Sequence, residues 1–292
     1  MGKLLHLMIS PILPANFPSW FPFLFYTTQF IGEVYLRYNA PAEVREHPDT
    51  LGQIGRIGSL SLVAFSVITF AGSIIIPWLV ESPEQESPEF TPRPPANIAR
   101  FLVEIDKYKP TLLTAWTCSH LIFAGSMAMA PFVTSLRAAT VIVAMCGIPW
   151  TLSCWAPFTF MGMEINKLSD SPMSNGHAHP KDRGSLDLVS NHHSASLEKE
   201  HPSNRPEGNL AGAYLGILNL YTTLPQFIGT FISWIVFSIL EPGKSPELAK
   251  HAHPGEHHST EGPNAIAVCL FIGALAALMA SYETNRLRRM VQ

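Results

Sequence analysis

The chain is built from apolar stretches of about 20 residues or more, which follow one another along most of its length. A helix needs a stretch of this length to cross the hydrocarbon of a bilayer, whereas a soluble core does not need several of them in succession. Barrel strands would alternate apolar and polar residues over about half this length. The sequence therefore excludes a soluble globular enzyme and predicts an all-α membrane protein.

Six membrane-spanning helices are expected. They lie at about residues 17–36, 57–80, 111–134, 138–162, 211–240 and 263–282. The first four fall within residues 19–163 and the last two within residues 210–289. Residues 1–18 hold three prolines and are expected to form an atypical N-terminal segment.

Lys and Arg are retained on the cytoplasmic side of a membrane protein, so their distribution predicts its orientation. Thirteen of the 19 Lys and Arg residues lie in the N-terminus, the 81–110 loop, the 164–209 loop and the C-terminus. We therefore expect these four segments in the cytoplasm and residues 241–262 outside it. Residues 164–209 are polar with few aromatic residues, which predicts a disordered loop.

The composition argues against a metal, a cofactor or a nucleic-acid partner. The net charge is −3 and no basic stripe is present. The four cysteines lie in apolar stretches without CxxC spacing, which argues against both a disulfide scaffold and a zinc site. Histidines gather in residues 177–201 and 251–258, but no cysteine or carboxylate framework fixes a metal geometry there.

Few ionisable residues lie in or beside the spans, and in a bilayer such residues usually mark a pathway. Glu33 is near the outer end of the first span and Arg56 opens the second on the same side, so an ion pair between them is geometrically easy. Anchoring of the helix ends at the interface is the alternative. Glu164 lies where the fourth span meets the cytoplasm, and the lone His120 in the third span favours a hydrogen-bonded packing role.

The fifth span contains the most informative set of polar residues. Asn219, Thr222, Thr223 and Gln226 recur at spacings of three and four residues and so share one helical face. Pro225 frees a backbone carbonyl one turn earlier. A face of amides and hydroxyls suits hydrogen bonds to a neutral polyol, and hydrogen bonding between neighbouring helices is the alternative.

Five segments resemble the sucrose and α-glucoside proton symporters of the glycoside–pentoside–hexuronide type, within the major facilitator superfamily, and above all their fungal branch. They are WFPFLFYTTQFIGEVY (20–35), LGQIGRIGSL (51–60), IPWTLSCWAPFTFMGMEIN (148–166), AGAYLGILNLYTTLPQ (211–226) and FSILEPG (237–243). The Gly-x-Leu-Asn followed by Pro-Gln is the most specific element. The resemblance covers about residues 19–289 and corresponds to the C-terminal six-helix half of a twelve-helix fold.

The resemblance implies proton-coupled transport of sucrose or related α-glucosides and no enzymatic activity. The residues implied in substrate binding are Arg56, Asn219, Thr222 and Gln226. The residues implied in proton coupling are Glu33 and Glu164. Two acidic positions of the plant relatives correspond here to Tyr26 and Thr28, so part of the proton chemistry of the family is absent from this half.

A six-helix half presents only half of a site, because such transporters hold substrate between two bundles. The resemblance therefore implies a partner, either a missing N-terminal half or another six-helix bundle, in the plasma membrane or alternatively the vacuolar membrane. The competing hypotheses are an inactive truncated fragment, a regulatory or structural membrane protein without transport activity, and a channel or scaffold of another class.

Overall fold

A computed structural model describes residues 13–41, 50–81, 109–169, 206–241 and 264–291. Within these ranges the chain is almost entirely helical, and the described residues form no strand beyond one backbone bridge between Glu81 and Thr111. The elements are α2 (Leu13–Val34), the π-helical η2 (Tyr35–Asn39), α4 (Thr50–Leu79), α6 (Leu112–Ala128), the 3-10 turn η3 (Ala130–Phe132), α7 (Leu136–Met145), α8 (Gly147–Ser169), α9 (Pro206–Leu240) and α11 (Ala265–Val291).

Five segments of the described chain are long and apolar enough to cross a membrane, which confirms an all-α, multi-pass integral membrane protein. They are Gly52–Leu79, Leu112–Phe132, Leu136–Met163, Gly212–Leu240 and Ala265–Met290. The expected first span corresponds to α2, which is a 22-residue helix but is not among the five. Its prolines and the polar residues 27–29 interrupt its apolar character.

Several boundaries differ from those expected. α2 begins at Leu13, inside the segment expected to be atypical, since proline is tolerated in the first turn of a helix. The expected fourth span is divided at Cys146 into α7 and α8. The helices α8 and α9 extend into both edges of the expected 164–209 loop. The rest of that loop, with most of residues 81–110 and 241–262, lies outside the described residues.

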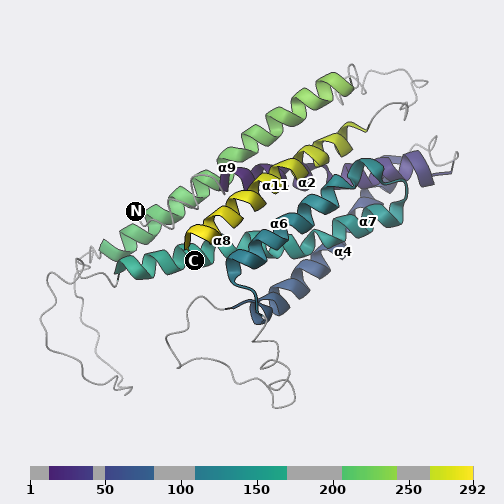
Figure 1. Cartoon of the computed structure of the whole chain (residues 1–292). Coiled ribbons are helices and arrows are strands. Elements are labelled where there is room, and N and C mark those ends of the chain that lie inside the picture. The colour runs from purple at the N-terminus through teal and green to yellow at the C-terminus, as the bar shows by residue number, and fades with distance from the viewer. Residues whose placement is uncertain (1–12, 42–49, 82–108, 170–205, 242–263, 292) are drawn as a thin grey trace, which may run out of the picture.

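Contacts between distant segments establish which helix ends meet (Figure 1). At one end of the bundle, the side-chain oxygen of Asn39 in η2 accepts a hydrogen bond from the backbone N–H of Leu136, at the start of α7, at 2.9 Å. At the other end, α4 finishes beside the start of α6. Arg288, near the end of α11, donates there to Thr114 Oγ1 in the first turn of α6 at 3.2 Å. The helices therefore alternate in direction, as successive membrane crossings require.

Aromatic side chains from four helices fill the centre of the bundle. The ring centroid of Trp20 in α2 lies 4.0 Å from that of Phe123 in α6 and 4.9 Å from that of Trp150 in α8. Phe23 lies 5.4 Å from Phe65 in α4. Aromatic pairs of this kind contribute about 0.5–1.5 kcal/mol beyond their buried area. Helix α2 thus sits in the middle, packed against α4, α9 and α11.

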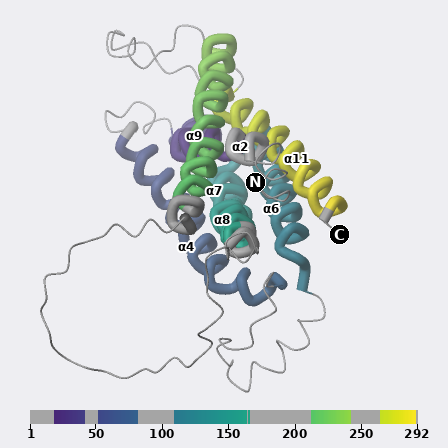
Figure 2. Tube along the Cα trace, turned by 90° about the vertical axis from the view of Figure 1, so that its left-hand side faces the viewer, coloured from purple at the N-terminus to yellow at the C-terminus, as the bar shows by residue number. Residues whose placement is uncertain are grey.

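Two helices are far more exposed than the others. Only 11% of the apolar segment in α4 and 17% of that in α9 is buried, against 61% for α6, 56% for α7–α8 and 50% for α11. Figure 2 shows α4 and α9 toward one side of the bundle and α6 and α11 toward the other.

Each of these two helices carries a stripe of exposed apolar side chains at spacings of three and four residues. The α4 stripe consists of Leu60, Val63, Val67, Phe70 and Ile74. The α9 stripe consists of Leu220, Leu224, Phe227, Phe231 and Trp234. In a membrane these stripes face either lipid or another helical bundle.

Candidate functional site

The polar face expected on α9 lies at the edge of its packed surface. Thr222 and Gln226 are partly buried, whereas Asn219 and Thr223 are exposed. The hydroxyls of Thr222 and Thr223 both donate to the backbone carbonyl of Asn219. Among the described residues, the side-chain amides of Asn219 and Gln226 make no hydrogen bond. Their donors and acceptors are therefore available to a polar ligand.

Pro225 lies beside this face, on the buried side of α9. Because proline has no N–H, the carbonyl of Tyr221 lacks its usual helical donor. The Asn219 carbonyl accepts two side-chain hydroxyls, and Pro225 lacks a backbone N–H. Both features weaken the backbone hydrogen bonding of α9 between Asn219 and Pro225. A carbonyl without its helical donor can accept a hydrogen bond from a hydroxyl group.

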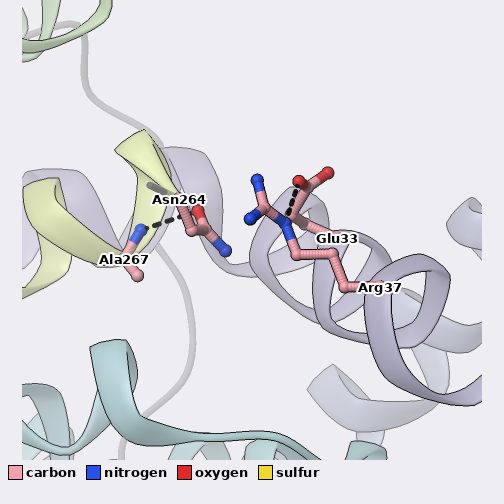
Figure 3. A network of polar contacts seen from close by, with 4 residues as sticks. All are labelled: Glu33, Arg37, Asn264 and Ala267. Atoms are coloured by element: carbon pink, nitrogen blue, oxygen red, sulfur yellow. Dashed lines mark hydrogen bonds and ion pairs between the residues drawn. The ribbon is translucent and has the colours of Figure 1, made fainter. Parts of the chain in front are cut away.

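Glu33 forms an ion pair at the end of α2. Its Oε1 accepts a hydrogen bond from Arg37 Nε at 2.6 Å, and both side chains are partly buried. Arg37 belongs to the π-helical turn η2, which follows α2 directly. Figure 3 shows this pair facing the start of α11, where the Asn264 side chain accepts a hydrogen bond from the N–H of Ala267 at 3.0 Å. The pair thus lies where α2 ends and α11 begins.

Arg37 therefore takes the place expected of Arg56 as the partner of Glu33. Residues four apart on a helix face each other, whereas a bond to Arg56 would have to cross to another helix. The spacing of four residues between Glu33 and Arg37 is a signal in the sequence that could have identified this pair. A π turn is itself frequent at functional sites.

Arg56 lies at the same end of the bundle as Glu33. Gly58 in α4 packs directly against Thr28 in α2, and this contact places Arg56 level with the last turns of α2. Arg56 is exposed and lies one helical turn before Leu60, so it stands at the head of the α4 stripe.

The two groups of expected site residues lie far apart along the bundle. Gly229 in α9 packs against Phe21 in α2, so the two helices run side by side with these two residues at the same level. Gln226 is therefore level with the beginning of α2, and Glu33 lies about 20 Å further along at a rise of 1.5 Å per residue. The structure does not bring Glu33 and Arg56 together with Asn219, Thr222 and Gln226.

The remaining expected residues are less informative. Glu164 lies near the end of α8, and its side chain is outside the described residues. His120 is buried with its ring 5.4 Å from that of Trp116, and its Nε2 has no hydrogen-bond partner within the described part of the chain. Among the residues that the structure describes, no group of three His, Cys, Asp or Glu side chains could hold a metal ion. The histidine-rich segments are not described.

Comparison with known proteins gives one informative relative. Over 92% of its length the chain is 24% identical to the "General alpha-glucoside permease" of Schizosaccharomyces pombe (strain 972 / ATCC 24843). The chain spans about half the length of this curated relative, since the match covers 48% of it. No family model matches the sequence.

Proposed function

We propose that the protein takes part in membrane transport of sugars, as half of a proton-coupled symporter for sucrose or related α-glucosides. The observation that carries the proposal is the similarity to the α-glucoside permease over 92% of the chain. The available amides on α9 support it, because a neutral disaccharide is recognised by hydrogen bonds and not by charge. In this role the protein is a carrier and performs no covalent chemistry.

The residues divide between two tasks in this proposal. Asn219, Thr222 and Gln226 bind sugar hydroxyls at the level of the beginning of α2. Arg56 is a further proposed sugar-binding residue, near the other end of the bundle, and its exposure on α4 suits this role. Glu33 carries the proton, so that protonation breaks its ion pair with Arg37. Glu164 is a second proton site at the far end of α8.

A second six-helix bundle completes the transporter. The exposed α4 and α9 stripes support this part of the proposal, because the two helices that carry them lie toward the same side of the bundle (Figure 2). The plasma membrane is the proposed location. The match to only 48% of the permease favours a second candidate function, a fragment that inserts in the membrane but transports nothing.

Uptake by a reconstituted full-length transporter tests the proposal. The chain is expressed alone and fused behind the part of the S. pombe permease that it does not match, in a yeast strain without α-glucoside uptake. We expect the fusion to accumulate labelled maltose or sucrose, faster in acidic than in neutral medium, and the chain alone to accumulate none. Equal surface expression of both is established by antibody labelling.

The Glu33→Gln variant of the fusion separates proton coupling from binding. Uptake that still responds to external acid in this variant would remove Glu33 from the coupling role. A correctly inserted fusion without any uptake, beside an active permease control, would favour the inactive fragment.

A further inference from the structure

The last two turns of α11 carry a cluster of arginines at the edge of the membrane. The apolar segment Ala265–Met290 is 26 residues long and contains Arg286, Arg288 and Arg289 among its last five residues. A span needs about 20 residues, so the end of this segment projects beyond the hydrocarbon. The three guanidinium groups therefore lie at the depth of lipid headgroups.

Arg288 holds an electrostatically unfavourable position that an anion would relieve. Its Nη1 donates to Thr114 Oγ1 at 3.2 Å, so the guanidinium lies against the first turn of α6. The N-terminus of a helix carries a positive partial charge, which repels a cation and attracts an anion. A phosphate beside Arg288 would gain from both the guanidinium and the helix dipole.

Arg286 and Arg289 extend this positive surface outward. Both are exposed, and they share a helical face with the exposed Tyr282 at spacings of four and three residues. Glu283 lies 3.6 Å from Arg286 and offsets one of the three charges. An excess of positive charge remains on the described end of α11. Tyrosine at this level is typical of the membrane–water interface.

We propose that this arginine cluster, Arg286, Arg288 and Arg289, is a binding site for the headgroup of an anionic phospholipid. The lipid phosphate meets Arg288 and the start of α6, and a second negative group such as the serine carboxylate of phosphatidylserine meets Arg286 or Arg289. The acyl chains lie along the apolar surface of α11 beside Tyr282. A lipid suits this site better than a soluble anion, because the charges stand at the end of a membrane-spanning helix. The proposal does not rest on transport activity.

Lipid selectivity of the intact, purified chain tests the proposal. The protein is reconstituted in phosphatidylcholine vesicles with traces of spin-labelled phosphatidylserine or spin-labelled phosphatidylcholine, and the motionally restricted fraction of each label is measured. We expect a preference for phosphatidylserine that falls by up to about fivefold for each arginine removed. The test variants are Arg289→Gln and the double change Arg286→Gln with Arg289→Gln. The matched control is Arg137→Gln, an exposed arginine at the start of α7, at the other end of the bundle.

Further measurements would either support or overturn the proposal. Arg286→Lys with Arg289→Lys keeps the charge and should retain most of the preference, and the unmodified protein should lose it in high salt. Equal association of the two labels, or an equal loss in Arg137→Gln, would overturn the proposal. Millimolar inorganic phosphate that abolishes the preference would show that the site takes a free anion and not a lipid. An unchanged unfolding temperature in pure phosphatidylcholine excludes a folding defect in the variants.

Discussion

The helices α4 and α9 differ from α6, α8 and α11 in how they use their apolar residues. All five contribute segments apolar enough to cross a membrane, but 11–17% of the segment is buried in the first two and at least 50% in the others. Apolar character alone therefore identifies a membrane helix without telling whether its surface faces protein or lipid. In a bilayer the hydrophobic effect does not drive helices together, so packing is decided by shape and hydrogen bonds.

The packed surfaces of the two exposed helices illustrate this point. On α4 the buried residues include Gly58, Ser61 and Gly72, and on α9 they include Gly229 and Ser233. These small residues let neighbouring backbones approach closely, whereas the large apolar residues form the outward α4 and α9 stripes. In this chain several of the closest contacts of α4 and α9 with neighbouring helices lie at such small residues.

The largest expected effect is the difference between replacing a buried phenylalanine in α6 and replacing an exposed one in α9. Phe123 in α6 is 1% exposed within the aromatic cluster, and Phe227 in the α9 stripe is 76% exposed. We expect Phe123→Ala to lower the free energy of unfolding by about 3 kcal/mol, because it leaves a cavity that its neighbours cannot fill. Phe227→Ala should change it little. Chemical unfolding in detergent micelles measures both, and similar losses would remove the distinction between the two sets of helices.

A smaller effect is expected from an added methyl group at two glycines. A Cβ on Gly147 would lie 2.8 Å from the carbonyl oxygen of Phe65, whereas a Cβ on Gly216 in α9 meets nothing within 4 Å. Gly147→Ala should therefore push α8 away from α4 and cost about 1–3 kcal/mol. Gly216→Ala is the matched control and should leave the unfolding temperature unchanged or raise it. Equal stability of the two variants would show that the contact between α4 and α8 is loose.

The sequence predicts the helices of this fold well because length and apolar character suffice for that. The α2 helix, although expected, holds a position in the bundle that its sequence does not indicate. Its prolines and the polar residues 27–29 give it a mixed character, yet it occupies the centre of the bundle, where neighbouring helices surround it on several sides. Nor could hydropathy place the division at Cys146, since α7 and α8 form one continuous apolar segment.

The candidate site was less predictable, because it depends on distances between helices. Glu33 and Arg56 were expected to pair across a short connection, but Glu33 pairs with Arg37 on its own helix. The spacing on α9 correctly grouped Asn219 with Gln226, because a helical repeat is a local property. The register of α9 against α2, which separates this group from Glu33 by about 20 Å, is set by tertiary contacts such as Gly229 with Phe21.

A third prediction tests whether the outward side of α9 serves a ligand or only faces lipid. In the permease fusion, Asn219→Leu should reduce sugar uptake about tenfold while the protein remains stable, since its amide bonds no other described group. The control Ser238→Leu replaces another exposed polar residue of α9 and should transport normally. Labelled sugar uptake at equal surface expression is the measurement. Normal uptake by Asn219→Leu would assign this face to lipid or packing.

The smallest expected effect concerns a hydrogen bond between a packed helix and an exposed one. Thr151 Oγ1 in α8 lies 3.1 Å from the carbonyl oxygen of Thr69 in α4 and 3.0 Å from that of Gly147 in its own helix. Both carbonyls also accept backbone hydrogen bonds, so Thr151→Val removes a contact without leaving an acceptor unpaired. Such bonds between membrane helices contribute about 0.6 kcal/mol, and a loss of that size in the free energy of unfolding is expected.

Thr230→Val is the matched control. The exposed Thr230 donates at 2.9 Å to the Gln226 carbonyl of its own helix, so its replacement should cost nothing measurable. A loss well above 1 kcal/mol in Thr151→Val would mean that hydrogen bonds, and not the close approach at Gly147, hold α4 to the bundle.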